Sequence, residues 1–260
     1  MPDAALDALR ERARSVLDRA FVPYSRTPEA AALLLADGAW VPGVRVETAS
    51  YPLLIPALLA AYYAARCAGR ADVVAAVQTR PFPTDAPAVL SAALGRPFHL
   101  AAPDALVAGD AALQEPGEVL DLFLDAPSPA DDAEGVALAE AVARRAHVPE
   151  SGFPVGCVAE AEDGRLVPGC NVEHADWTRG LCAERVTLAA ARGYGAGALR
   201  RLYLTCPRDP RATPCGACRQ VLAELAPGVP VVMGRGAAPP EVATPERLLP
   251  GAFTGDALRA

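Results

Sequence analysis

The 260-residue chain repeats itself, and this repetition constrains its fold more than any other feature. When Val22 is set against Val148 and both segments are read forward without a gap, 13 of the 38 positions up to Leu59 and Arg185 are identical. The shared residues include an Asp-Gly pair and a Val-Pro-Gly triplet, in the same order in both segments. The sequence therefore predicts two tandem copies of one structural unit.

Each copy is predicted to begin with a helix and to continue with a β-hairpin. The first helix covers residues from about 3 to Ala20, and its counterpart runs from about Ala133 to His147. The hairpins turn at Asp37-Gly38 and Asp163-Gly164, because an Asp-Gly pair between apolar runs favours a tight turn. A second helix follows each hairpin, and strands alternating with helices indicate an α/β fold with a mixed or parallel sheet that is covered on both faces.

Three cysteines of the second copy are spaced as zinc ligands. Cys182 precedes an alanine-rich helical run, and Cys215 and Cys218 lie three residues apart in a helix predicted over Pro214–Leu225. The positive ends of both helices would favour thiolates. A catalytic zinc takes three protein ligands and leaves its fourth position to water. Glu184 is therefore predicted to be a general acid/base and not a fourth ligand.

Charge balance and the number of ligands predict the roles of two further residues near these cysteines. Three thiolates on a divalent ion leave a net negative charge that opposes ionisation of a bound water, so a nearby cation is expected. Arg185, one helical turn from Cys182, is the candidate for this charge-balancing role. His174 is not expected to bind the metal, because three cysteines already suffice. A Cys-x-x-Cys pair alone would equally indicate a redox pair or a structural metal site.

The first copy lacks the chemistry of the second. Its residues opposite Cys182, Glu184 and Asn171 are Pro56, Leu58 and Arg45. Its segment Pro81–Leu94, which stands where the second pair of cysteines would be, contains no cysteine. The first copy nevertheless keeps a strongly apolar helical run at Leu53–Ala65, including two tyrosines. We predict that it binds no metal and serves as a structural partner of the second copy.

These pieces, in this order, resemble the cytidine deaminases across the whole C-terminal half. The motifs that carry the resemblance are Phe-Pro-Val-Gly at 153–156, Asn-Val-Glu at 171–173, Cys-Ala-Glu-Arg at 182–185, Pro-Cys-Gly-Ala-Cys-Arg-Gln at 214–220 and Leu-Leu-Pro-Gly-Ala-Phe at 248–253. The resemblance implies a three-layer α/β/α sandwich with a mixed sheet. It also implies zinc-dependent hydrolysis of cytidine and deoxycytidine to uridine, deoxyuridine and ammonia, in pyrimidine salvage.

The resemblance also assigns residues to the substrate. It implies that Asn171 and Glu173 hold a ribose hydroxyl, that Phe153 packs beside the pyrimidine and that Ala183 contacts the substrate. Phe253 is a further candidate for a pocket contact. Glu184 is expected to take a proton from the attacking water and to return protons to the ring nitrogen and to the leaving amine.

Two departures from the family pattern leave the substrate open. Glu150 stands where the family usually has a tyrosine, which the first copy keeps as Tyr24. Trp177, followed by Thr178-Arg179, stands where a smaller aromatic residue is common. Another aminopyrimidine nucleoside, such as a nucleoside antibiotic, is therefore an alternative substrate. A catalytically silent zinc-binding module is a second alternative, but a structural site has no use for an open position beside an acid.

Composition narrows the partners and the compartment. The formal net charge is −7, no lysine is present and no arginine cluster stands out, which argues against a nucleic-acid partner and favours a small nucleoside. No apolar run is long enough to span a bilayer, and no signal peptide is visible. Because three of the seven cysteines are needed as thiolates, a cytoplasmic location is expected.

The domain boundaries follow from the repeat and from a proline-containing polar stretch at Ala126–Asp132. We expect a non-catalytic domain at 1–125 and a catalytic domain at 131–260. Single-domain members of the family assemble as tetramers, so the resemblance implies that two such chains form a homodimer with four copies in a pseudo-tetramer. One zinc per chain is expected.

Overall fold

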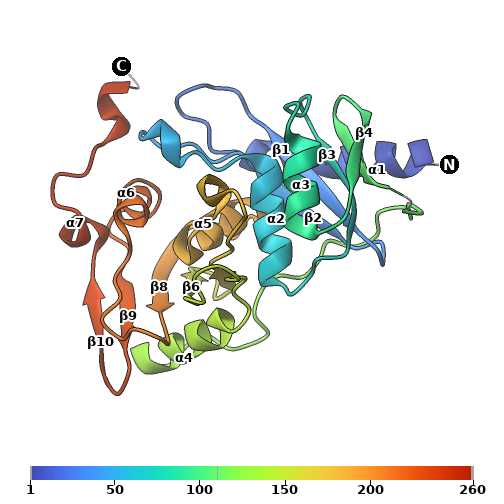
Figure 1. Ribbon diagram of the computed structural model, residues 1–260. Coiled ribbons are helices and arrows are strands. Elements are labelled where there is room, and N and C mark those ends of the chain that lie inside the picture. The colour runs from blue at the N-terminus through green and yellow to red at the C-terminus, as the bar shows by residue number, and fades with distance from the viewer. Residues whose placement is uncertain (1, 110, 259–260) are drawn as a thin grey trace.

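A computed structural model describes residues 2–109 and 111–258, although not the side chains of residues 2, 3 and 257. The chain forms two five-stranded sheets that lie beside each other, each with its own helices (Figure 1). No helix in the described part of the chain combines the length and the apolar character that a membrane crossing requires.

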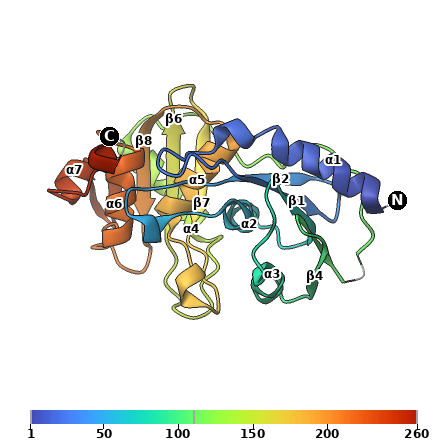
Figure 2. The same cartoon turned by 90° about the horizontal axis from the view of Figure 1, so that it is seen from above.

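The first copy builds its sheet in the order β2-β1-β3-β5-β4, and every pair of neighbouring strands is antiparallel. Its elements are α1 (Pro2–Arg14), η1 (Leu17–Arg19), β1 (Ala30–Leu35), β2 (Trp40–Val44), η2 (Tyr51–Leu53), α2 (Ala57–Cys67), β3 (Val73–Gln78), α3 (Ala86–Leu94), β4 (Phe98–Ala102) and β5 (Ala105–Ala108). In Figure 2, α1 lies on one side of this sheet and α2 and α3 on the other.

The second copy builds a mixed sheet in the order β10-β9-β8-β6-β7, in which only β8 and β9 run parallel. Its elements are α4 (Asp132–Ala143), β6 (Gly156–Ala161), β7 (Leu166–Cys170), η3 (Trp177–Arg179), α5 (Ala183–Tyr194), β8 (Leu199–Thr205), α6 (Gly216–Leu225), β9 (Val231–Arg235), β10 (Ala238–Ala243), α7 (Pro245–Leu248) and η4 (Gly255–Leu258). The predicted α/β/α class and the tandem arrangement are confirmed, and the mixed sheet belongs to this copy.

Close approaches at two glycines show how α4 and α5 sandwich the second sheet. A Cβ atom on Gly156 would lie 2.0 Å from the carbonyl oxygen of Ala139 in α4, and one on Gly169 would lie 2.1 Å from Oγ1 of Thr187 in α5. Gly169 pairs with Cys157, the residue after Gly156, and successive residues of a strand point to opposite faces. The two helices therefore cover opposite faces. The first copy has an equivalent close approach, in which Gly43 of β2 lies against Ala57 and Ala61 of α2.

Both predicted Asp-Gly hairpins are present. Gly38 and Gly164 adopt φ values of 87° and 85°, which glycine reaches without steric penalty, and each aspartate side chain accepts the amide of the residue after the glycine. The Val-Pro-Gly triplets place proline on β2 and β7, which are edge strands and can dispense with the missing donor.

Helix starts differ from the prediction by a few residues. The helix expected from Leu53 begins at Ala57, because Pro52 and Pro56 break the run into a 3-10 turn and an extended N-cap. The helix expected from Pro214 begins at Gly216, with Cys215 in an extended conformation as N-cap. The first helix ends at Arg14 and a short 3-10 turn follows it.

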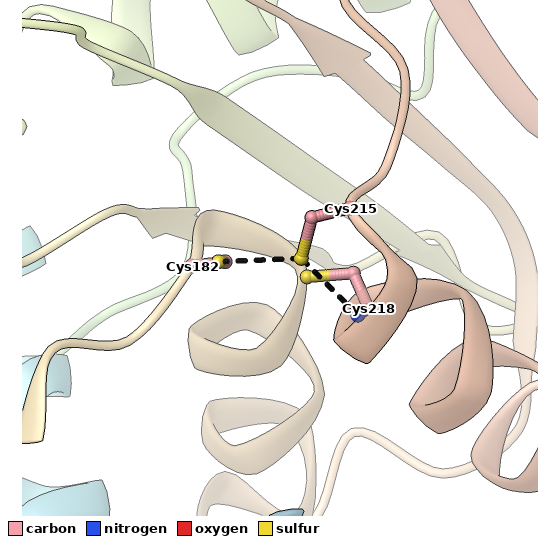
Figure 3. A group of neighbouring side chains, drawn as sticks. All are labelled: Cys182, Cys215 and Cys218. Atoms are coloured by element: carbon pink, nitrogen blue, oxygen red, sulfur yellow. Dashed lines mark hydrogen bonds between the residues drawn. The ribbon is translucent and has the colours of Figure 1, made fainter. Parts of the chain in front are cut away.

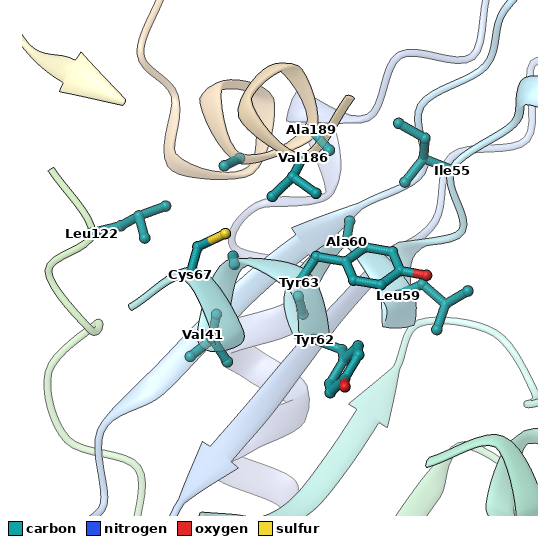
Figure 4. Close-up of a cluster of buried hydrophobic side chains, with 14 of the residues drawn as sticks. Val41, Ile55, Leu59, Ala60, Tyr62, Tyr63, Cys67, Leu122, Val186 and Ala189 are labelled. Atoms are coloured by element: carbon teal, nitrogen blue, oxygen red, sulfur yellow. The ribbon is translucent and has the colours of Figure 1, made fainter. Parts of the chain in front are cut away.

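The two copies join through α2 and α5, which pack against each other. Figure 4 shows side chains of α2, among them Tyr63 and Cys67, between β2 of the first copy and Val186 and Ala189 of α5. These residues belong to one continuous hydrophobic core that runs through both copies. Because α2 and α5 are equivalent helices in the repeat, the joint is a pseudo-twofold interface.

Polar contacts at this interface occur in equivalent pairs. Arg19 donates from Nη1 to the carbonyl of Gly193 at 2.8 Å, and Arg145 donates to the carbonyl of Cys67 at 3.5 Å. Arg192 lies 4.7 Å from the ring centroid of Phe21, and Arg66 lies 2.7 Å from Nδ1 of His147. All members of these pairs are related by the same 126-residue offset as the repeat.

Candidate metal centre and active site

The three cysteines singled out from the sequence converge at the N-termini of two helices. Cys182 is the N-cap of α5, Cys215 is the N-cap of α6, and Cys218 lies in the first turn of α6. Their sulfur atoms all lie within 4.8 Å of one another (Figure 3). The extended N-cap conformations direct both capping thiols off the helix ends, where the helix dipoles favour negative charge.

The geometry of this cluster fits zinc. Zn–S bonds of about 2.3 Å place the sulfurs of a tetrahedral site about 3.8 Å apart. The sulfurs of Cys182 and Cys215 are 3.9 Å apart. Cys218 is buried, Cys182 is partly buried and Cys215 is exposed, so the cluster is open on one side. A trio of thiols with one open side matches a catalytic zinc site better than a closed structural one.

The cluster favours a thiolate at one of its three sulfurs, that of Cys215. Hydrogen bonds from the thiols of Cys182 and Cys218, together with the amide of Cys218 at 3.4 Å, lower the pKa of Cys215. The reciprocal hydrogen bonds raise the pKa values of the two donor thiols. The negative charge is thus concentrated on the sulfur at the N-cap of α6. A bound metal cation would displace the remaining thiol protons and stabilise all three groups as thiolates.

Glu184 occupies the second position of α5 and is only 4% exposed. Burial raises the pKa of its carboxyl group to about 7, against the opposing effect of a hydrogen bond from its own backbone amide. A carboxyl group with such a pKa can both accept and release a proton near neutral pH.

A cavity of about 190 Å³ brings this acid, the thiols and the expected substrate residues together. It is lined by Cys182, Cys215, Glu184, Asn171 and Phe153, with the end of β8 and residues 212–213 closing it. Phe153 is 39% exposed at the mouth of the cavity. An adjoining hollow of about 170 Å³ is lined by Asn171, Glu173 and Cys182, and also by Trp177.

The two polar residues of the Asn-Val-Glu motif are held by the preceding loop. The side chain of Asn171 accepts the amide of Val155 at 2.8 Å and donates to the carbonyl of Phe153 at 2.9 Å. The carboxylate of Glu173 accepts the amides of Glu150 and Ser151 and the hydroxyl of Ser151. These bonds leave one N–H of the asparagine and further acceptor positions on both side chains for a ligand.

The remaining predicted residues are placed less centrally. Ala183 is the fully buried first residue of α5. Arg185 donates from Nη2 to the carbonyl of Leu53 at 3.0 Å, and its Nε is buried with no hydrogen-bond partner among the described residues. Phe253 is 53% exposed and does not line the cavity, although its backbone is bonded to Gln220. His174 lies outside the thiol cluster, with Nδ1 accepting the amide of Asp176.

Two groups of site residues were not found from the sequence. Thr205 and Cys206, at the carboxyl end of β8, line the cavity. Thr205 could have been predicted from its polar side chain at the carboxyl end of a strand, because ligands of α/β sheets often bind there. Ser151 fixes Glu173, and the equivalent bonds between Ser25 and Glu47 in the first copy could have revealed that pairing through the repeat.

The first copy has the local fold of the site without its ligands. Pro56 is the N-cap of α2 with φ −65° and ψ 147°, close to the −70° and 155° of Cys182. The described residues contain one group of three or more potential metal-binding side chains, and it is the cysteine trio of the second copy.

Comparison with known families detects both copies. Residues 129–233 and residues 2–79 each match a family model described as a cytidine and deoxycytidylate deaminase zinc-binding region. The solved structure of cytidine deaminase from Burkholderia pseudomallei is 34% identical, with a TM-score of 0.44 over 46% of this chain and 98% of that chain.

Individual relatives match about half of the chain and most of their own length. The cytidine deaminase of Sporosarcina psychrophila is 39% identical over 115 residues, which are 44% of this chain and 85% of that protein. The cytidine deaminase of Halalkalibacterium halodurans is 38% identical over 112 residues, 43% of this chain and 85% of that protein. With 85% of a 39% identical relative matched by less than half of this chain, and a family match in each copy, the chain belongs to the cytidine deaminase family in a tandem form.

Proposed function

We propose that the chain catalyses the zinc-dependent hydrolytic deamination of cytidine and deoxycytidine, giving uridine or deoxyuridine and ammonia. The observation that carries the proposal is a buried carboxyl group, Glu184, in one cavity with two of three clustered thiols. Cys182, Cys215 and Cys218 would hold the metal. Bound zinc supplies Lewis acidity, which makes a water molecule acidic enough to serve as a nucleophile near neutral pH.

The chain's own residues would move the protons and place the ring. Glu184 takes a proton from the attacking water, which adds to carbon 4 of the pyrimidine. Glu184 delivers this proton to ring nitrogen 3, then takes the remaining proton from the hydroxyl group on carbon 4 and passes it to the amino group. The carbonyl forms at carbon 4 as the C–N bond breaks and ammonia leaves. Phe153 packs against the base at the mouth of the cavity, and the first turn of α5 at Ala183 borders the ring. Arg185 offsets the charge of the thiolates.

A panel of aminopyrimidine nucleosides tests this assignment. We expect the purified zinc-loaded protein to convert cytidine and deoxycytidine with loss of the cytosine absorbance and release of one ammonia per substrate. Adenosine, whose purine is larger than the pyrimidine this cavity is proposed to take, serves as the negative control. Turnover of another aminopyrimidine nucleoside with a much higher kcat/KM than cytidine would reassign the substrate.

Sugar recognition is assigned to Asn171 and Glu173. Leaving a sugar hydroxyl unpaired in a dry pocket costs about 1–3 kcal/mol. Glu173→Ala is therefore expected to lower kcat/KM for cytidine by about 5- to 150-fold and to affect free cytosine far less.

The repeat supplies a matched control for that variant. Glu47 makes the same hydrogen bonds to Ser25 that Glu173 makes to Ser151, in the copy without ligands. Glu47→Ala should reproduce the loss of loop stability, measured by thermal unfolding, and should affect cytidine and free cytosine equally. Equal losses on cytidine and cytosine in Glu173→Ala would make Glu173 a structural residue only.

We further propose a division of labour between residues 1–125 and residues 131–260. The first would be a non-catalytic partner and the second the catalytic unit. The shared core between α2 and α5 supports this division, because separating the copies would expose a large apolar surface. The need for three reduced thiols supports the cytoplasm as the site of action.

A homodimer with four copies is the proposed assembly. Tyr51 and Trp177 occupy equivalent positions in the repeat and are 85% and 65% exposed, and Phe253 is 53% exposed. Exposed aromatic residues at related positions support a symmetric interface.

Light scattering with metal analysis checks this assembly. We expect a mass near twice 26.9 kDa and one zinc per chain. A fragment starting at residue 131 should aggregate or lose activity. A fully active monomeric fragment, or two zincs per chain, would contradict the division of labour.

A further inference from the structure

One segment of the first copy contacts both helices that carry the cysteines. Residues 49–53 reach α6 through Glu224 and α5 through Arg185, although these partners lie more than 130 residues away in the chain. The 3-10 turn η2 connects the two contact points. In Figures 1 and 2 this turn, coloured light blue, lies beside α6.

The contact with α6 is made by both oxygens of one carboxylate. Oε2 of Glu224 accepts the amide of Ala49 at 2.7 Å, and Oε1 accepts the hydroxyl of Tyr24. Glu224 lies on the same helix as Cys215 and Cys218, in its last turn. The two donors come from separate loops of the first copy, so together they restrain both the position and the rotation of the helix.

The contact with α5 is made close to the metal cluster. Arg185 lies in the first turn of the helix that Cys182 caps, and it donates to the carbonyl of Leu53 at 3.0 Å. Leu53 is the last residue of η2, so the anchor on α5 and the anchor on α6 belong to one short, continuous piece of backbone.

This arrangement matters because the ligands come from two helices. The spacing between the sulfurs of Cys182 and Cys215 depends on how α5 and α6 are held relative to each other. A shift of about 1 Å would leave the sulfurs unable to complete a tetrahedral site, which tolerates only about 0.2 Å in bond length. We propose that the first copy supports the zinc site from outside, with Tyr24, the 49–53 segment and Glu224 as positioning groups for the ligand helices.

The same contacts explain a difference between the copies. Position 24 is tyrosine, whereas its counterpart in the second copy is Glu150. A glutamate at position 24 would face the carboxylate of Glu224 and repel it, but the tyrosine hydroxyl donates to it. The tyrosine at position 24 is thus the residue type that the hydrogen bond to Glu224 of α6 requires.

Zinc affinity of the full-length protein tests the proposal, which rests on the ligand assignment made above. Competition with a chromogenic chelator should show zinc binding about tenfold weaker in Glu224→Ala and weakened in Tyr24→Phe, as for other residues that orient metal ligands. The zinc-induced rise in Tm should shrink in the same variants. When loaded with cobalt, these variants should differ in visible absorption from cobalt-loaded wild-type protein, because this absorption reports the coordination geometry.

Two control variants remove the same groups elsewhere. Glu140→Ala deletes an exposed glutamate of α4, and Tyr62→Phe deletes a tyrosine hydroxyl that donates to the carbonyl of Ala93 within the first copy. Both should keep wild-type zinc affinity and the wild-type cobalt spectrum. A merely structural Glu224 would lower the Tm of zinc-free and zinc-loaded protein equally and leave the affinity unchanged.

The outcomes separate this proposal from the one on which it rests. If wild-type protein binds one zinc and both Tyr24→Phe and Glu224→Ala bind it equally tightly, the supporting role of the first copy is wrong and the ligand assignment stands. If wild-type protein binds no zinc, the ligand assignment itself is wrong. If Glu224→Ala does not fold, Tyr24→Phe decides, because it removes a single oxygen atom.

Discussion

Replacing Glu184 by glutamine is expected to leave zinc bound and to lower kcat by about 10²–10⁴-fold. The amide has nearly the shape of the carboxyl group, so α5 and the cavity should be unchanged. It cannot accept the proton that the attacking water must lose or return protons to the ring and the leaving amine. The loss should therefore appear in kcat, with zinc content and cytidine binding close to wild type.

A second buried glutamate provides the control for this variant. Glu160 is fully buried on β6, where it contacts Arg200 and accepts the hydroxyl of Tyr203, and it does not line the cavity. Glu160→Gln should lower the Tm while retaining most of the turnover. Steady-state kinetics and zinc analysis of both variants give the comparison, and a Glu184→Gln enzyme within about threefold of wild type would remove Glu184 from the proposed mechanism.

Replacing Cys215 by alanine is expected to abolish zinc binding and, with it, turnover. Two thiols would remain, whereas catalytic zinc sites use three protein ligands. The site would also lose the sulfur on which negative charge is concentrated at the N-cap of α6. Metal analysis after gel filtration should find less than a tenth of the wild-type zinc, and the variant should lose the stabilisation that zinc gives the wild-type protein.

Cys67 supplies the matched thiol control. It is fully buried in α2 and does not belong to the group of three clustered thiols, and its sulfur contacts Cys170. Cys67→Ala should lose stability because a buried side chain is shortened, but it should keep one zinc per chain. A Cys215→Ala protein that remained fully loaded with zinc would exclude Cys215 as a ligand.

Local features of the fold were predictable because short segments encode them. The hairpins at Asp37-Gly38 and Asp163-Gly164 follow from the conformational freedom of glycine at the turn, and both are present. Element ends were less predictable. The start of α6 depends on the side chain of Cys215, whose sulfur accepts the amide of Cys218. The antiparallel first sheet and β10 were not predicted, because strand partners are chosen by packing across the sheet and not by neighbouring residues.

The sequence by itself determined that the chain is a tandem repeat and that one copy carries three cysteines with metal-ligand spacing and an acid beside one of them. Both conclusions depend only on residue type and spacing, which the chain displays directly. Only the tertiary structure decided that Phe153 lines the cavity while Phe253 stays outside it, and that Tyr24 and Leu53 of the first copy contact the ligand helices. The physical reason is that these contacts join segments far apart in the chain, 132 residues for Leu53 and Arg185 and 200 for Tyr24 and Glu224, and no local pattern specifies them.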